Sequence, residues 1–323
     1  MNSIVDVAEL AQDVQDFLRF KRAMGIGYRR AEFVLDSFVR FVEQYGDAHG
    51  EVALDEAVRR WSARTTGRKA VTVGNEFGVI RQLCLYRRRR DPSCYVPEHA
   101  LAPVKESVFL PYIFTDDDIR RILAAASGHK GRYIWGAMLR TLILVLYCTG
   151  IRLGEAVRLS TADVDLDCGL LTIQRSKGRS RILPIRADLV GELHRYVDLR
   201  RQRVAVNRCP DPAAFFLRLD ASPLTVDSAS QALRRLLREL GMKPPSGRSG
   251  PRPYEFRHAF AVHRLTAWAI AGDDVHAKLP WLSAYLGHQN VLGTEVYLKA
   301  TPQLLELASD RFEAHLRRAP QRR

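Results

Sequence analysis

Four short segments of the sequence carry side chains that could take part in catalysis. The first, TGIRLGE, begins at Thr149 and places Arg152 three residues before Glu155, so a helix would bring the guanidinium and the carboxylate onto one face. Guanidinium groups bind phosphate oxygens in pairs and stay charged at any relevant pH, so phosphate binding is the chemistry open to such an arginine. Taken alone, the pair is better explained as an ordinary surface ion pair.

The other three segments follow in order along the chain. Lys177 lies at the predicted tip of a hairpin, where a lysine is usually just exposed to solvent. Tyr254 and Arg257 are three residues apart in PYEFRHAFA, so a helix would point both side chains the same way. His288 ends an LGH segment, and Tyr297 follows nine residues later. A single tyrosine near apolar residues is usually part of a core, so none of these segments assigns a function by itself.

The elements that must position these residues are mostly helices. A long apolar helix is predicted over about residues 134–148, and Gly150 ends it directly before the first arginine. Strand-like runs at 170–173 and 181–185 flank a basic segment, which predicts a hairpin. An earlier helix begins after Thr115, a good N-cap that is followed by three aspartates. This part of the chain is therefore predicted to be helix-rich with one small sheet.

The first hundred residues show apolar side chains repeated at helical spacing. We predict helices over residues 7–18, 31–42, 54–61 and 70–85. A small helical bundle is therefore expected over residues 1–100, followed by a linker at 101–112 and a second domain at 113–323. A run of four arginines at 87–90 precedes a proline-containing stretch, 92–111, which is typical of a linker.

Composition favours a polyanionic partner. The net charge is +14 and the isoelectric point is about 9.9, and each lysine or arginine placed on a phosphate releases condensed counterions. The five cysteines form no CxxC pair and lie beside no histidine cluster, which argues against a disulfide framework and a structural zinc site. The first ten residues lack an apolar signal-peptide core, and the most apolar stretch, 141–148, is too short to span a bilayer. We therefore expect a cytoplasmic protein with no membrane partner.

Taken together, the ordered set of TGIRLGE, a hairpin lysine, RHAFA, LGH and a tyrosine nine residues after that histidine resembles the tyrosine recombinase (phage integrase) family. The resemblance covers roughly the second two-thirds of the chain. It implies a mainly α fold with a small β-sheet: an N-terminal helical, SAM-like core-binding domain and a C-terminal integrase-type α+β catalytic domain. It also implies a site-specific recombinase that acts on double-stranded DNA in integration, excision or transposition of a mobile element.

The resemblance assigns a role to each residue. Tyr297 would attack the scissile phosphorus and give a 3′-phosphotyrosine and a free 5′-hydroxyl. Arg152 and Arg257 would stabilise the charge that grows on the non-bridging oxygens. Lys177 would protonate the departing 5′-oxygen, and His288 would donate a hydrogen bond to the phosphate or assist proton transfer.

The implied scheme needs no cofactor. Glu155 would orient Arg152 from behind, and the two catalytic arginines would replace the divalent ions that nucleases use. The sequence has neither a carboxylate cluster suited to such ions nor a Gly-rich phosphate loop. ATP is not required, because the covalent link conserves the energy of the broken bond.

Tyr254 departs from the family pattern, because the family usually has a histidine three residues before the second arginine. A phenol can donate a hydrogen bond to a phosphate oxygen, but it is a poor general base at neutral pH. Either His288 and solvent carry the proton transfer, or the site is slower. An accessory DNA-binding protein that has lost catalysis is the alternative from another class, and a type IB topoisomerase is the alternative within the same chemistry. Tyr254 could also compete as the nucleophile, although its place beside Arg257 disfavours this.

Two further features concern DNA binding and assembly. Basic residues near the linker and on a predicted helix are candidate phosphate contacts, although a solvated face is the simpler explanation of such charges. These residues are Arg87, Arg88, Arg89, Arg90, Arg234, Arg235 and Arg238. After Tyr297, apolar spacing over 304–316 predicts a final helix. In the family, such a segment often docks on a neighbouring protomer, which would give a homo- or hetero-tetramer on two DNA sites; packing within one chain is the equal alternative.

Overall fold

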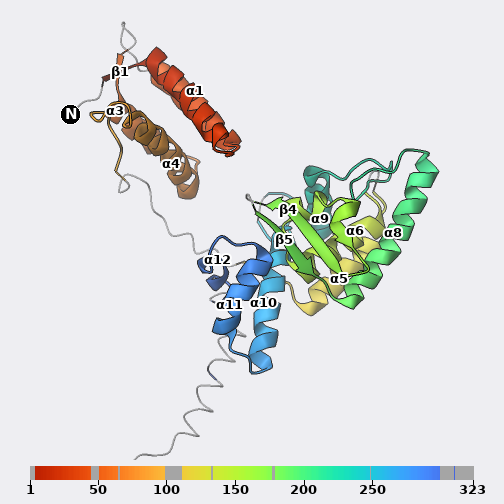
Figure 1. Ribbon diagram of the computed structural model, residues 1–323. Coiled ribbons are helices and arrows are strands. Elements are labelled where there is room, and N and C mark those ends of the chain that lie inside the picture. Colours follow the sequence, from red (N-terminus) through yellow and green to blue (C-terminus); the bar gives the residue numbers. More distant parts are fainter. Residues whose placement is uncertain are drawn as a thin grey trace, which may run out of the picture. The chain divides into compact units, whose positions relative to one another are not determined.

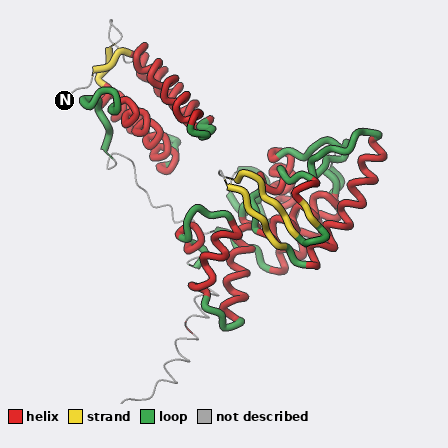
Figure 2. Tube along the Cα trace, in the orientation of Figure 1, coloured by secondary structure: helices red, strands yellow, loops and turns green. Residues whose placement is uncertain are grey.

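The computed structural model describes residues 4–44, 51–64, 66–98, 111–131, 134–176, 179–247, 249–298 and residue 309. The fold is mostly helical with small sheets, as predicted (Figures 1 and 2). Contacts within the chain group it into two compact units, Met1–Phe109 and Leu110–Arg323. Most of the predicted linker lies outside the described residues, so the domain boundaries stay a prediction.

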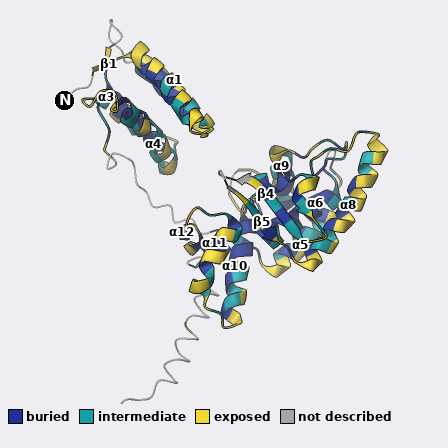
Figure 3. Ribbon diagram, viewed as in Figure 1, coloured by how far each residue is buried: buried dark blue, intermediate teal, exposed yellow. Residues whose placement is uncertain are grey.

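The first unit packs four helices around an aromatic core. The helices are α1 (Val7–Ala23), α2 (Arg29–Glu43), α3 (Leu54–Ala63) and α4 (Ala70–Arg87). The ring of Trp61 packs edge-on against Phe38 and Phe41, with ring centroids 5.4 and 5.3 Å apart. Each helix turns one buried face inward and one exposed face outward (Figure 3), which is the amphipathic pattern that the sequence predicted.

A two-stranded antiparallel ribbon in this unit was not predicted. It pairs β1 (Ile4–Asp6) with β2 (Glu51–Ala53), and Val5 lies opposite Val52 in its centre. Each strand has three residues, of which one valine is buried. A strand this short shows no alternation of apolar and polar residues, so the sequence carries no readable signal for it.

Arg87 belongs to the core of the first unit and not to its solvated surface. Its side chain is buried, and its Nε donates to Asp13 of α1 at 2.6 Å. Arg90 also pairs with Asp13. This contact ties the end of α4 to α1, so Arg87 does not face a DNA backbone. Arg88 and Arg89 are exposed and remain candidates for phosphate contact.

The second unit is built around the apolar helix α6 (Gly136–Thr149), which packs against α5, α8 and α10. A three-stranded antiparallel sheet of order β3-β4-β5 adds its inner face to the same core, where Leu171 pairs with Leu183 (Figure 1). The remaining elements are α5 (Asp116–Ser127), α7 (Leu153–Val157), β3 (Val164–Asp165), β4 (Leu170–Ser176), β5 (Arg179–Pro184), α8 (Ala187–Asn207), α9 (Val226–Glu239), α10 (Glu255–Ile270), α11 (Val275–Leu286) and α12 (Leu292–Glu295).

Local sequence signals set two of the boundaries in this unit. Thr115 caps the start of α5, as the sequence predicted, and it also forms a reciprocal capping box with Asp118, with both hydrogen bonds at 3.1 Å. Gly150 ends α6 in the left-handed conformation (φ +63°), and a Cβ there would clash with the ring of Phe260. The glycine therefore allows the sharp turn that brings Arg152 to the start of α7.

The fold bears on two expectations from the sequence, one about disulfide bonds and one about membrane-spanning helices. The five cysteines are all free thiols. Within the described ranges, every helix falls short of the length and apolar character needed to cross a membrane.

Candidate active site

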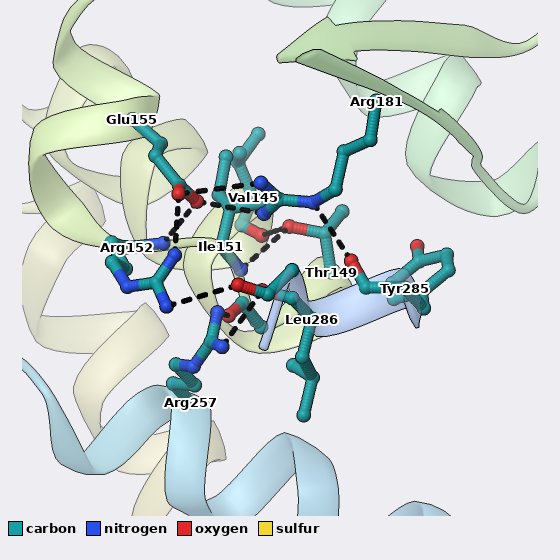
Figure 4. A network of polar contacts seen from close by, with 11 residues as sticks. Val145, Thr149, Ile151, Arg152, Glu155, Arg181, Arg257, Tyr285 and Leu286 are labelled. Atoms are coloured by element: carbon teal, nitrogen blue, oxygen red, sulfur yellow. Dashed lines mark hydrogen bonds and ion pairs between the residues drawn. The ribbon is translucent and has the colours of Figure 1, made fainter. Parts of the chain in front are cut away.

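The end of α11 gathers three arginines from different parts of the second unit (Figure 4). The last carbonyls of a helix lack partners within the helix and lie at the negative end of its dipole, so they attract cations. Three successive carbonyls each accept from a different arginine: Tyr285 from Nε of Arg181 at 2.9 Å, Leu286 from Nη2 of Arg257 at 2.7 Å, and Gly287 from Nη2 of Arg152 at 3.3 Å. Two of these arginines were predicted as site residues, and Arg181 was not.

Glu155 lies between two of the arginines and is buried. It accepts from Nη1 of Arg152 at 2.7 Å and from the backbone N–H of Arg152 at 3.0 Å. It also accepts from Nη1 and Nη2 of Arg181 at 3.3 and 2.8 Å. The predicted contact between Arg152 and Glu155 is confirmed, but it belongs to a buried network and not to the surface.

A sequence signal for Arg181 existed in the strand pattern. Arg181 precedes Leu183 by two residues on β5, so both side chains lie on one face of the strand. Leu183 is buried in the core, whereas Ile182 between them is exposed. An arginine on the inward face of a strand needs a buried acceptor, and that requirement could have marked it as part of a site.

Arg257 on α10 is the most deeply buried of the three arginines, with 1% of its surface exposed. Its Nη1 donates to the carbonyl of Gly150 at 2.8 Å, which ties the turn after α6 to the end of α11. Burial lowers the pKa of Arg257, and the nearby charge of Arg152 lowers it further. Its Nε is buried and has no hydrogen-bond partner among the described residues, so it is a donor that a ligand oxygen could satisfy.

Tyr297, just after α12, is buried beside the arginines with 1% of its surface exposed. Its ring packs edge-on against His258 and parallel to His288, at centroid distances of 5.3 and 6.2 Å. Burial raises the pKa of its phenol, while the charges of Arg257 and Arg152 oppose that rise. The pKa of the phenol therefore stays above its ordinary value, and the charges of both arginines reduce the cost of forming the phenolate that a nucleophile needs.

His288 follows the glycine that ends α11. Its Nδ1 lies 2.7 Å from Oγ1 of the buried Thr294, and its backbone N–H donates to the carbonyl of Ser283 at 3.0 Å. These contacts fix the ring beside Tyr297. The structure thus brings together Arg152, Glu155, Arg257, His288 and Tyr297, as the sequence predicted.

Tyr254 is the residue before the first turn of α10, and 42% of its surface is exposed. Its ring packs edge-on against His258, with centroids 4.8 Å apart, and His258 in turn contacts Tyr297. Tyr254 and Arg257 therefore differ in burial although they are three residues apart. The sequence analysis missed His258, whose ring separates the two tyrosines.

Replacement of Tyr254 by histidine is expected to preserve or raise DNA cleavage. The exposed position accepts an imidazole at little cost, and general acid–base catalysis contributes about 10²- to 10⁴-fold where a group of suitable pKa is in place. The measurement is the single-turnover rate of covalent complex formation, with Tyr254→Phe as the control that removes the hydroxyl alone. A large loss in Tyr254→His would show that the phenol has a specific role.

His258 gives the folded chain a pH-dependent stability. Burial, then the charges of Arg257 and Arg252, lower its pKa from 6.5 to about 4. Between these values the unfolded chain binds more protons than the folded chain, so stability falls as the pH drops from 6.5 towards 4. We expect a loss of about 1 to 2 kcal/mol, because partial exposure of the ring screens the full effect.

Chemical denaturation at pH 7 and pH 4.5 tests this effect in the wild type and in His258→Phe, which keeps the ring contacts. The half-buried His263 also has a lowered pKa and contributes in the same direction, so the difference between the two proteins is the readout. Equal pH dependence in both would assign the effect to other groups.

Other predicted site residues lie outside this cluster or outside the described chain. Lys177 is not among the described residues; it falls between β4 and β5, which form the predicted hairpin, and its role stays a prediction. On α9, Arg234 and Arg235 are exposed, whereas Arg238 donates to loop carbonyls of Pro244 and Gly247. Of the predicted helix over 304–316, residue 309 alone is among the described residues, so that helix stays a prediction. Across the described ranges, no group of three or more metal-binding side chains occurs.

Comparison with known proteins places the chain. The model of the phage integrase family matches residues 113–303. The chain is 33% identical over 308 residues to the putative integrase/recombinase y4rB of Sinorhizobium fredii, which covers 94% of this chain and 96% of that protein. It is 28% identical over 212 residues to the tyrosine recombinase XerA of Thermococcus kodakarensis, covering 65% and 66%. The solved structure of the Tn1549 transposon integrase in complex with transposon right end DNA has a TM-score of 0.67, with 18% identity and coverage of 94% and 98%.

The fold is thus that of the solved recombinases, a mainly helical protein with small sheets. The chain belongs to the phage integrase family, the tyrosine recombinases, which are enzymes that cleave and rejoin DNA.

Proposed function

We propose that this protein is a site-specific recombinase in which Tyr297 is the nucleophile. The phenolic oxygen attacks the scissile phosphorus and forms a 3′-phosphotyrosine bond, its proton passes to His288 or to solvent, and the bond from phosphorus to the 5′-oxygen breaks. Lys177 supplies the proton to that 5′-oxygen, which leaves as a hydroxyl. A second 5′-hydroxyl then attacks the phosphotyrosine, restores the DNA backbone and releases Tyr297.

The observation that carries this proposal is the arginine cluster, of which Arg152 and Arg257 act on the phenol of Tyr297. Arg152, Arg181 and Arg257 bring three positive charges and Glu155 brings one negative charge, which leaves an excess of two (three minus one). A phosphodiester carries one negative charge, and a second develops as the pentacoordinate transition state forms. A fixed excess of positive charge at this point stabilises the transition state more than the bound substrate, which is the requirement for catalysis.

Arg152 and Arg257 are the proposed phosphate clamp. The buried Nε of Arg257 offers a donor without a protein partner among the described residues. The side chain of Arg152 is 20% exposed and so can be reached from outside. His288, held against Thr294, donates to the phosphate or assists proton transfer in this scheme.

DNA is the proposed partner of both units. The net charge of +14 supports binding to a polyanion, and the exposed Arg88, Arg89, Arg234 and Arg235 are proposed to contact phosphates. Residues 1–100 would form the core-binding domain, and residues 113–323 the catalytic domain. We propose that the protein acts in the cytoplasm as a homo- or hetero-tetramer on two DNA sites, which native mass measurement of the protein–DNA complex would test.

A nicked suicide substrate tests the proposed chemistry. Duplexes that bind the protein are first selected from a random-sequence library, because the chain does not reveal its target. A nick placed just beyond the cleavage position lets the short 5′-hydroxyl fragment diffuse away, so the covalent complex accumulates. The expected result is a protein–DNA adduct that survives denaturation and forms without added metal or ATP. Absence of the adduct on every selected duplex would contradict the proposal.

A catalytically impaired DNA-binding partner is the second candidate, and Tyr254 is the residue that favours it. Such a protein would bind the selected duplexes and yield no adduct alone. Addition of an active partner recombinase would then restore strand exchange between two sites.

A further inference from the structure

Each nitrogen of the Arg181 guanidinium donates to a protein acceptor. Its Nε donates to Tyr285, and its two terminal nitrogens donate to the two carboxylate oxygens of Glu155 (Figure 4). Its side chain is 13% exposed, less than that of Arg152 at 20%. We infer that Arg181 is a positioning residue, which fixes Glu155 so that Glu155 can orient Arg152 towards the phosphate.

The reason lies in the geometry of a shared carboxylate. Arg152 binds one oxygen of Glu155 through Nη1 and the other through its backbone N–H, so without Arg181 these contacts with a single residue would hold the carboxylate. Arg181 binds both oxygens of Glu155 as a planar fork, and this arrangement fixes the plane of the carboxylate. Arg152 then meets an acceptor whose direction is already set. A second cation also offsets the cost of burying the Glu155 charge, which is 1% exposed.

The same arginine ties the hairpin to the end of α11. Tyr285 accepts from Arg181 through its carbonyl and donates through its hydroxyl to the carbonyl of Pro184 at 3.1 Å. Gly287 makes the approach possible, because a Cβ there would lie 2.7 Å from Nη1 of Arg181. β5 begins two residues before Arg181, and Lys177 precedes the first residue of β5 by two positions in the sequence. Arg181 thus links the strand next to the proposed general acid with the carbonyls that hold the clamp.

This inference rests on the proposed function, since it concerns the orientation of the proposed clamp. The test is the single-turnover rate of covalent complex formation at saturating DNA, measured for the wild type, Arg181→Met and a matched control. Arg140→Met is the control, because Arg140 also forms a forked pair with a glutamate, Glu192, at 2.7 and 3.3 Å, away from the cluster. We expect Arg181→Met to slow the reaction by about 10- to 100-fold. Losses of this size are seen when a residue that orients a directly binding side chain is removed. Arg140→Met should react at the wild-type rate, and DNA affinity should be unchanged in both.

A substrate with one non-bridging oxygen replaced by methyl separates positioning from general damage. This methylphosphonate removes charge that Arg152 is proposed to stabilise. On one of the two diastereomers, Arg152→Ala should react as fast as the wild type, and this diastereomer identifies the oxygen that Arg152 contacts. If Arg181 acts through Arg152, the defect of Arg181→Met should shrink on that same diastereomer. A merely structural defect would slow both substrates by the same factor and would overturn the inference.

Arg181→Lys is a second variant that keeps the test valid if Arg181→Met fails to fold. It keeps the positive charge but replaces the fork with a single ammonium, so it should fold and still show the substrate-dependent defect. Wild-type rates in both Arg181 variants would overturn the role of Arg181 alone. Absence of the adduct in the wild type would instead overturn the proposed function, so the two failures are distinguishable.

Discussion

Replacement of Tyr297 by phenylalanine should abolish covalent capture of the suicide substrate and leave DNA affinity unchanged. Phenylalanine keeps the ring that packs between His258 and His288 in a buried site, so the fold should survive. The change removes the oxygen that would bond to phosphorus. We expect a loss of at least about 10⁴-fold in adduct formation, the scale observed when the nucleophile of a catalytic unit is removed. Denaturing gels measure the adduct, and a mobility shift measures binding.

Tyr196→Phe is the matched control for this experiment. Tyr196 is equally buried in the same unit, and its hydroxyl is hydrogen-bonded at 3.3 Å to Phe215 and at 3.1 Å to Leu217. Its loss should lower stability by about 1 kcal/mol and leave capture intact. An adduct that persists in Tyr297→Phe would show that another residue is the nucleophile. Tyr254 is then the first to map by mass spectrometry, because it lies across His258 from Tyr297.

The sequence predicted those parts of the site that depend on local geometry. Arg152 is the N-cap residue of α7 and Glu155 is the third residue of that helix, so a capping box at the helix start places them together. Gly150 and Gly287 each end an apolar run and take the left-handed conformation, as glycines after helices commonly do. The resemblance to a family then predicted that the turns at these glycines lie close to Arg257, His288 and Tyr297.

Contacts between distant segments were beyond prediction. Arg181 meets the carbonyl of Tyr285 across 104 residues of sequence, and Arg87 meets Asp13 across 74. A single sequence does not show whether an arginine in a basic run has a buried acidic partner or is exposed to solvent. The sequence therefore offers all four arginines of the run at 87–90 as candidate phosphate contacts, although the first of them is buried. The net charge predicts a polyanionic partner, but it does not identify which arginines contact that partner.

The carbonyl groups at the end of α11 explain how three positively charged side chains can lie close together. Arg152, Arg181 and Arg257 would repel one another in an apolar setting, yet each has a carbonyl from residues 285–287 as acceptor. The helix end and Glu155 together make the cluster stable before any DNA is bound. Preorganised charge of this kind needs little rearrangement during the reaction, which is why such arrangements lower barriers.

Arg257→Lys should therefore cause the second large loss of activity. Lysine keeps the charge, but one ammonium cannot serve Gly150, Leu286 and the position of the buried Nε together. We expect cleavage to slow by about 10²- to 10³-fold, the usual cost of removing one donor that stabilises transition-state charge. Stability should fall by about 1 to 3 kcal/mol, because a buried carbonyl loses its partner.

Arg200→Lys separates these two effects. Arg200 is also buried, and it donates to the carbonyls of Phe215 and Ala214 at 3.1 and 2.9 Å, far in sequence from the clamp. Its replacement strands buried carbonyls in the same way, so thermal unfolding should show a similar loss of stability, while single-turnover cleavage stays within about 2-fold of the wild type. If Arg200→Lys slowed cleavage as much as Arg257→Lys, destabilisation would account for both defects, and Arg257 would have no distinct part in binding the phosphate. A defect confined to Arg257→Lys requires that its guanidinium acts on the reacting group itself.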